Sequence, residues 1–257
     1  MYTIDLSGRV ALIAGVANKR SLAWAIAQCL SDAGARLVLT YAGERIRPNV
    51  EKLAAEIPGT LTFECDVSSD EGIDAAFEKI SQRVDRIDAF VHAVAFARKE
   101  DLEGKFFDTS RDGFHLALDV SAYSLLAMTR RVVPLVPETG GSILSLSYIA
   151  AQRAVPSYNV MGTAKASLEQ MTRQLAFELG PEKIRVNSIS AGPVNTLSAR
   201  GIAGFTNILN HYKEIAPLQR NITQEEVGTS GLFLCSDMSR GITGEVMYVD
   251  AGYNIMM

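Results

Sequence analysis

Apolar residues in this chain gather in short runs, and longer stretches between them alternate apolar and polar positions with a helical period. Each run is almost continuously apolar, as in parallel strands buried on both faces. The runs cover residues 9–14, 36–40, 61–65, 87–94, 141–146, 184–189 and 246–249. Strand and helix patterns alternate almost to the end of the chain. This predicts an α/β fold of Rossmann type, with a doubly wound parallel sheet of seven strands in a single domain covering 1–257.

One segment departs from this rhythm. Residues 190–217 follow the sixth run and hold several Gly and Pro residues, then a short amphipathic stretch. Ligands of open α/β sheets bind outside the carboxyl ends of the strands. The position and composition of the segment therefore favour a substrate-binding lid that can move. A long ordered loop is the alternative.

Composition places the chain among ordinary globular proteins. Its 257 residues are 47% hydrophobic and 21% charged, with a formal net charge of -4. This balance gives no sign of a nucleic-acid surface, and no apolar run reaches the roughly 18 residues that suggest a membrane span. The N-terminus lacks the basic and then apolar pattern of a signal peptide. We therefore expect a cytoplasmic protein without nucleic-acid or membrane partners.

The cysteines and histidines predict neither disulfides nor a metal site. The three cysteines are far apart and odd in number, which fits a reducing compartment. His115 and His211 lack partners at any metal-ligand spacing. His92 closes the apolar part of the fourth run, and we interpret it as a packed strand residue.

The strongest chemical pattern lies at 148–165, where Tyr148 and Tyr158 precede Lys165 by seventeen and seven residues. A helix entered just after Pro156 would put Tyr158 and Lys165 on one face, because seven residues are almost two turns. A nearby ammonium group favours the anion of a phenol, and the two groups together can stabilise an oxyanion that forms in a reaction. A packed tyrosine and a surface lysine are the alternative for this pair taken alone.

Residues that follow the first, third and fourth runs are candidates for a dinucleotide site. Gly15 would let the backbone approach a pyrophosphate, and Ser21 can offer a hydroxyl and an amide where a helix begins. Because the motif is not GxGxxG, an ordinary N-cap serine is the alternative. Asp66 lies where adenine would lie, or it caps a turn. The small residues of HAVAFA at 92–97 suit a cofactor that presses on the backbone.

Three longer segments carry a family resemblance: YNVMGTAKASLE at 158–169, IRVNSISAGPVNTLSARGI at 184–202 and ITGEVMYVDAGY at 242–253. Over its whole length the chain resembles the short-chain dehydrogenase/reductases, and more closely their divergent branch, the bacterial enoyl-acyl-carrier-protein reductases. Common members of the superfamily place their acid tyrosine four residues before the lysine, where this chain has Met161. Enoyl reductases carry tyrosine at both positions that Tyr148 and Tyr158 occupy. The resemblance therefore implies reduction of a C=C bond rather than of a ketone.

The resemblance also implies a role for each candidate residue. Tyr158 would hydrogen-bond the thioester oxygen and stabilise an enolate, Lys165 would hold the nicotinamide ribose, and Tyr148 would shape the site or assist proton delivery. The cofactor contacts of the family map onto Gly15, Ser21, Leu22, Asp66, Val67, Val94, Lys165, Val194 and Thr196. Its substrate contacts map onto Ala97 and, along the acyl channel, Met161, Ile202 and Phe205. Core packing is the alternative for the three channel residues, and no metal is implied.

Cofactor and partners follow from the same resemblance. It implies a nicotinamide cofactor, an acyl carrier protein bearing the enoyl substrate, and a homotetramer. No acid follows the second run at the usual ribose-recognising position, and we expect NADH, with NADPH open because Arg45 or Arg47 could contact a 2′-phosphate. Arg200, Lys213 and Arg220 are the basic residues near the lid that could meet an acidic carrier protein.

Two other functions remain open. A carbonyl or alcohol oxidoreductase of the same superfamily is disfavoured, because Met161 occupies the position of its tyrosine. A non-catalytic dinucleotide-binding protein would not need Tyr158, Lys165 and the lid segment together.

Overall fold

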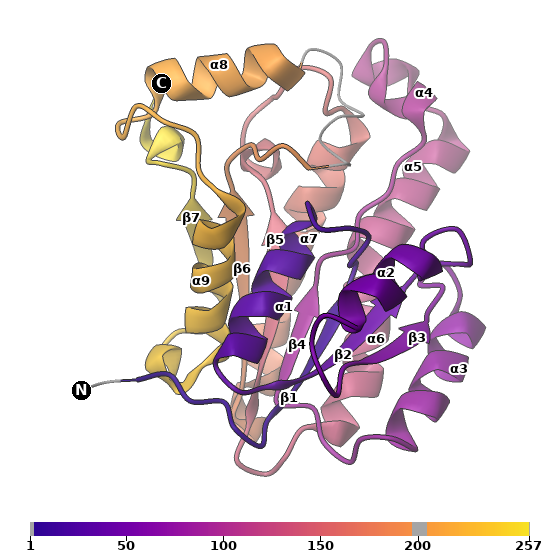
Figure 1. Ribbon diagram of the computed structural model, residues 1–257. Coiled ribbons are helices and arrows are strands. Elements are labelled where there is room, and N and C mark those ends of the chain that lie inside the picture. The colour runs from indigo at the N-terminus through magenta and orange to yellow at the C-terminus, as the bar shows by residue number, and fades with distance from the viewer. Residues whose placement is uncertain (1–2, 197–204, 257) are drawn as a thin grey trace.

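The computed structural model describes residues 3–196 and 205–256, and it has the layered α/β architecture that the apolar runs predict (Figure 1). Seven parallel strands form one sheet in the order β3-β2-β1-β4-β5-β6-β7. The strands are β1 (Val10–Ala14), β2 (Arg36–Tyr41), β3 (Leu61–Glu64), β4 (Ala89–His92), β5 (Gly141–Ser147), β6 (Ile184–Ala191) and β7 (Val246–Val249). The strand order reverses between β1 and β4, which confirms the doubly wound topology.

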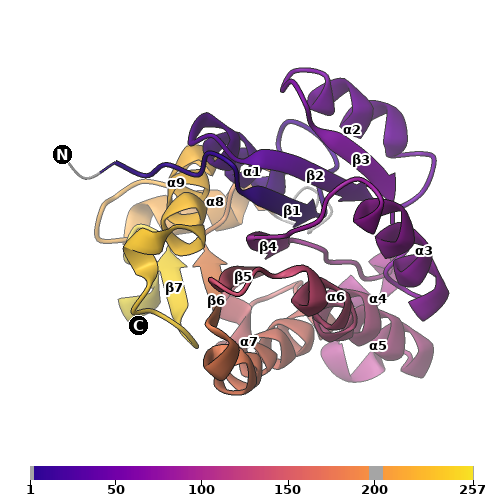
Figure 2. The ribbon, with the colours of Figure 1, turned by 90° about the horizontal axis from the view of Figure 1, so that it is seen from below.

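Helices cover both faces of this sheet (Figure 2). One face carries α1 (Leu22–Asp32), α2 (Arg47–Ala54) and α9 (Gln224–Cys235). The other carries α3 (Asp70–Ser81), α6 (Ser124–Val132) and α7 (Val160–Leu179). Beside α7 lie α4 (Lys99–Leu102) and α5 (Arg111–Leu118). Helix α8 (Phe205–Ile215) lies across the carboxyl edge of the sheet (Figure 1).

Two apolar clusters fill the space between the sheet and its helices. Successive side chains of a strand point to opposite faces. Ile13 of β1 therefore packs with Trp24 of α1, while Leu12 packs with Phe90 of β4 and Leu168 of α7. All five residues of β1 are buried, which explains why the sequence of this strand is apolar without alternation.

Two predicted boundaries near the site are wrong. The strand predicted over 87–94 ends at His92, because its neighbour β1 ends opposite that residue. The helix predicted to begin just after Pro156 begins instead at Val160. Ser157 and Asn159 have φ angles of 60° and 38°, which a right-handed helix cannot include.

The described ranges 3–196 and 205–256 contain no helix that is long and apolar enough to cross a membrane. In the same ranges, no group of three or more His, Cys, Asp or Glu residues could hold a metal ion. The thiols of Cys29, Cys65 and Cys235 are free.

Candidate active site

The two predicted catalytic tyrosines meet at the carboxyl edge of the sheet. Tyr148 directly follows β5, before a short helical turn at Ile149–Ala151, and Tyr158 lies in the turn before α7. Their ring centroids are 4.9 Å apart and the rings are tilted by 55°. The fold therefore brings both phenols to one place at the end of a central strand.

Lys165 lies within α7 and is buried against β5. Its side chain is 6% exposed, and its Nζ donates a hydrogen bond to the Leu146 carbonyl oxygen at 2.7 Å. Burial lowers the pKa of Lys165 to about 8, while the nearby Glu169 carboxylate acts to raise it. Glu169 is itself buried and accepts hydrogen bonds from Ser147 at 2.7 Å and Gln152 at 3.3 Å.

The predicted helical register of Tyr158 with Lys165 is wrong, whereas their electrostatic pairing stays a prediction. Tyr158 does not lie on the helical face of Lys165, because α7 begins two residues after it. Burial raises the pKa of the Tyr158 phenol above its ordinary value, and Tyr148 raises it further. Tyr158 is therefore neutral near pH 7 and can donate a hydrogen bond.

Tyr148 is also contacted from α8. The Tyr212 hydroxyl donates to the Tyr148 hydroxyl at 3.4 Å. Tyr212 is 4% exposed and stacks on Tyr253, with 3.6 Å between ring centroids and 15° between ring planes. Burial raises the pKa of both Tyr148 and Tyr212. Sequence reasoning gave no role to Tyr212, which lies in an amphipathic stretch without a motif, or to Tyr253, although Tyr253 ends the segment at 242–253 that carries the resemblance.

His92 at the end of β4 is a packed residue, as interpreted from the sequence. Its ring is fully buried, and Nε2 lies 2.7 Å from the Ser124 hydroxyl. The Ser124 hydroxyl donates to the Val120 carbonyl at 2.7 Å, so it accepts from His92. Burial lowers the pKa of His92 to about 3, and the ring is neutral at physiological pH.

Gly15 lies where the loops after β1 and β4 touch. Its φ is +102°, and a Cβ there would lie 2.2 Å from the Ala93 carbonyl oxygen. Only glycine fits such an approach without strain. The two loops bound the point where the strand order reverses, which is where dinucleotides bind in this fold.

Ser21 shapes the loop that leads from Gly15 into α1. It occupies the N-cap position, but its side chain makes no capping bond to the helix. Its hydroxyl donates to the Asn18 carbonyl and accepts from the amides of Ala17 and Asn18, each at 3.3 Å. The first turn of α1, which begins at Leu22, has no acidic residue, so the helix N-terminus suits an anionic phosphate.

The other cofactor candidates lie near the same edge. Asp66 follows β3 and accepts from the amide and the hydroxyl of Ser68 at 2.9 and 2.7 Å, which is the turn-capping role left open above. Val67 and Val94 pack in the cluster on the α3 face. The remaining two candidates lie on the loop after β6. Val194 packs in the cluster on the α1 face, and the Thr196 amide donates to the Val194 carbonyl at 2.7 Å.

Two substrate candidates adjoin Tyr158. Met161 and Ala97 belong with it to one small apolar cluster between α7 and the segment that holds α4 and α5. The Met161 sulfur lies 3.7 Å from the Ser121 hydroxyl. Met161 packs in this cluster, as the core-packing alternative predicts. It also lies beside Tyr158, the phenol assigned to catalysis.

The predicted lid is only partly within the described residues. Residues 190–196 and 205–217 are described, whereas 197–204, with Ile202 and Arg200, lie outside them. Phe205 is the first residue of α8 and is half-buried. Through Tyr212, α8 touches the site.

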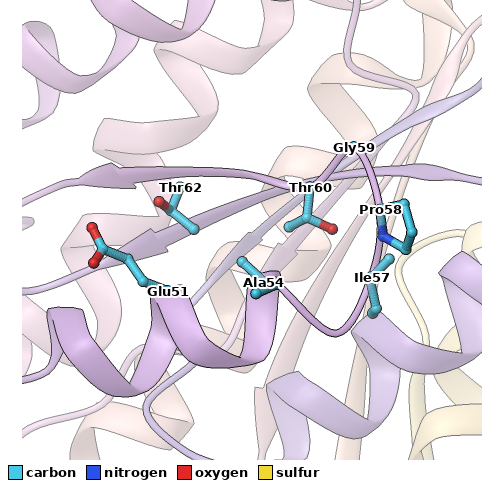
Figure 3. Close-up of a pocket in the computed structure, with 8 residues that line it drawn as sticks. Glu51, Ala54, Ile57, Pro58, Gly59, Thr60 and Thr62 are labelled. Atoms are coloured by element: carbon cyan, nitrogen blue, oxygen red, sulfur yellow. The ribbon is translucent and has the colours of Figure 1, made fainter.

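A surface pocket lies far from these residues (Figure 3). It is formed where α2 ends and β3 begins, at the amino ends of the strands. Residues that line it include Glu51, Ala54, Ile57, Pro58, Gly59, Thr60 and Thr62. Since ligands of open α/β sheets bind at the carboxyl ends, this pocket is not the candidate site.

Known proteins resemble the chain over almost its whole length. A family model described as Enoyl-(Acyl carrier protein) reductase matches residues 15–254. The chain is 51% identical over 253 residues to an enoyl-[acyl-carrier-protein] reductase [NADH] of Bacillus cereus, with 98% of each chain covered. It is 48% identical over 253 residues to an enoyl-[acyl-carrier-protein] reductase [NADPH] of Staphylococcus aureus, again with 98% of each covered.

A solved structure agrees in fold. The crystal structure of the Bacillus cereus enoyl-acyl carrier protein reductase with NADP+ and indole naphthyridinone has a TM-score of 0.95 and 50% sequence identity to this chain. The match covers 98% of this chain and 99% of that one. By sequence and by structure, the chain belongs to the enoyl-(acyl carrier protein) reductase family.

Proposed function

We propose that the chain is an enoyl-acyl-carrier-protein reductase of fatty-acid elongation, acting on the C2=C3 double bond of a trans-2-enoyl thioester. The observation that carries this proposal is the contact between Tyr148 and Tyr158 at the carboxyl edge of the sheet, 4.9 Å between ring centroids. Relatives with nearly the full length of this chain are named for the same reaction.

The reduction needs a group that stabilises negative charge on the thioester oxygen. When bound, reduced nicotinamide supplies the hydride that adds to the β-carbon of the substrate. The electron pair of the C=C bond then moves onto the thioester oxygen as an enolate, and the α-carbon finally takes a proton that comes from water. Tyr158, protonated near pH 7, donates a hydrogen bond to that oxygen. Tyr148, whose ring contacts that of Tyr158, shapes the site and assists orientation or proton delivery.

Lys165 and the loop after β1 would hold the cofactor. A buried ammonium with one carbonyl partner is costly, and perturbed lysines of this kind concentrate at functional sites. Two of its three N–H donors remain for the ribose hydroxyls of the nicotinamide. Gly15 and the start of α1 lie where the pyrophosphate would bind.

The charged residues that follow β2 favour NADH as the cofactor. Arg47, which could contact a 2′-phosphate, is held by two carboxylates, Glu44 at 3.1 Å and Glu51 at 2.7 Å. Relatives are named for NADH and for NADPH, so both cofactors occur among proteins similar to this chain. Arg45 stays available to NADPH as the weaker alternative.

The partners follow from the same reaction. The substrate arrives on acyl carrier protein, and Lys213 is an exposed cation on α8 that could meet it. Arg220 is less suited, since it forms an ion pair with Glu226 at 2.6 Å. Exposed Phe177 and Ile255 fit burial between subunits of the predicted homotetramer. The cytoplasmic location, the single domain over 1–257 and the lid over 190–217 stay predictions.

Tyr158→Phe tests the proposal. Loss of the donor should lower kcat for a trans-2-enoyl-acyl-carrier-protein by about 10²–10³, with KM for NADH little changed. Oxidation of NADH is followed by absorbance, with a ketoacyl substrate run alongside. Tyr123→Phe is the matched control, because its phenol is 40% exposed and removal of that hydroxyl should leave kcat intact. An undiminished kcat in Tyr158→Phe, or turnover of the ketoacyl substrate alone, would contradict the assignment.

A further inference from the structure

Four tyrosines form a continuous series from the candidate site to the C-terminal segment. The Tyr158 ring contacts the Tyr148 ring, the Tyr148 hydroxyl accepts from Tyr212, and the Tyr212 ring stacks on Tyr253. These side chains come from the turn before α7, the end of β5, α8 and the segment after β7. The series thus links elements that are far apart along the chain.

The outer end of the series is firmly held. The Asp250 carboxylate accepts from the amides of Gly252 and Asn254 at 2.9 and 2.8 Å. Arg153, just beyond Tyr148, donates to the carbonyl oxygen of Asn254 at 2.7 Å. The stacking partner of Tyr212 is therefore fixed to the same part of the structure as the catalytic tyrosines.

The direction of the hydrogen bond defines what Tyr212 can do. Its hydroxyl donates, so the Tyr148 oxygen accepts and the Tyr148 proton points elsewhere. The O–O distance of 3.4 Å is longer than the roughly 2.8 Å typical of hydroxyl pairs. Hydrogen bonds of active sites are often long without substrate and tighten when it binds. Tyr212 is buried and Tyr148 is partly buried, and an unpaired hydroxyl is costly where water is excluded.

We propose that Tyr212 is a positioning residue for the reduction: its hydroxyl anchors the Tyr148 hydroxyl oxygen and so keeps the Tyr148 ring against Tyr158. This inference rests on the proposed function, because it assigns Tyr212 an effect on enoyl reduction through Tyr148. Tyr212 itself touches neither the substrate oxygen nor the cofactor in this assignment. The stack on Tyr253 holds the Tyr212 ring in place, because a mobile Tyr212 could not keep its hydrogen bond to Tyr148.

The test removes only the hydroxyl. Tyr212→Phe keeps the ring that stacks on Tyr253, so the fold is preserved, and kcat for a trans-2-enoyl-acyl-carrier-protein should fall about threefold to tenfold, as for loss of one hydrogen bond. KM for NADH should not change. In a Tyr148→Phe background the same substitution should have no further effect, because the acceptor is gone. Tyr123→Phe again serves as the hydroxyl-removal control.

The outcomes distinguish failure of the proposed function from failure of the positioning role of Tyr212. Failure of the unaltered protein to reduce any enoyl substrate would refute the proposed function. With that activity present, an unchanged kcat in Tyr212→Phe would overturn the positioning role, and so would an equal loss in both backgrounds. If Tyr148→Phe turns over too slowly for the comparison, the single variant decides: a fall in kcat with constant KM for NADH supports the role, and a rise in that KM alone refutes it.

Discussion

Lys165→Met is expected to change how the stability of the protein depends on pH. Lys165 is 6% exposed, and burial lowers its pKa from 10.5 to about 8 despite the opposing effect of Glu169. At about 1.36 kcal/mol per pKa unit, the gap between these values corresponds to about 3 kcal/mol. The folded protein bears this cost at neutral pH, where the lysine is protonated in both the folded and the unfolded state.

The cost is relieved as the pH rises. Between pH 10.5 and about pH 8 the unfolded chain keeps the Lys165 proton while the folded chain has released it. Stability rises with pH wherever the unfolded state binds more protons. Relative to Lys165→Met, the unaltered protein should therefore gain about 2 kcal/mol in free energy of unfolding between about pH 7 and pH 9.5. His92, whose pKa Lys165 helps to lower, titrates near pH 3, outside the range compared, so the comparison isolates this lysine.

Urea denaturation of both proteins at the two pH values measures the effect. Protein concentrations must match, because association changes apparent stability, and no nicotinamide is added. Lys213→Met is the matched control, since Lys213 is exposed on α8 and its loss should give the same difference at both pH values. A Lys165→Met difference that stays flat with pH, or that moves in favour of the variant as pH rises, would refute the buried-ammonium reasoning.

Two further variants test the cofactor site. Replacing Glu44 and Glu51 together by Gln frees Arg47, and the ratio of kcat/KM for NADPH to that for NADH should rise; an unchanged ratio would show that Arg47 does not contact the 2′-phosphate. Gly15→Ala should lower the free energy of unfolding by about 1–3 kcal/mol and weaken NADH binding. In Gly43→Ala the φ is also positive but nothing lies within 4 Å, so equal losses in both variants would exclude the clash.

Much of the fold follows from the sequence, because burial on both faces leaves a strand almost no polar positions. Each of the seven predicted runs overlaps one observed strand, and the helices between them fall on both faces. The ends are less predictable, since they depend on neighbours. The strand predicted over 87–94 stops at His92 only because β1 has ended beside it. No local pattern carries that information.

The candidate site also has features that the sequence predicts and features that depend on the tertiary fold. The spacing of Tyr148, Tyr158 and Lys165 is a sequence feature, and the family is recognised through it. The helical register assumed for Tyr158 failed because Ser157 and Asn159 adopt positive φ. Asn is enriched at positive φ, but Ser is not, so the residue types carry only a weak signal of this turn. The contact of Tyr212 with Tyr148 joins residues 64 positions apart and exists only once α8 is placed on the sheet.

The direction in which burial shifts the pKa of Tyr158 bears on whether this phenol acts as an acid, as in carbonyl reduction, or as a hydrogen-bond donor, as in enoyl reduction. A tyrosine that must give its proton to a ketone oxygen works best when its pKa lies near the operating pH. Burial and Tyr148 move the pKa of Tyr158 the other way, which makes it a poor acid but a neutral hydrogen-bond donor. Reduction of a C=C bond requires only a hydrogen-bond donor at this oxygen. The oxygen carries negative charge only in the enolate intermediate, and the proton is finally added to the α-carbon. The environment of Tyr158 therefore suits the neutral hydrogen-bond donor that stabilisation of an enolate oxygen requires.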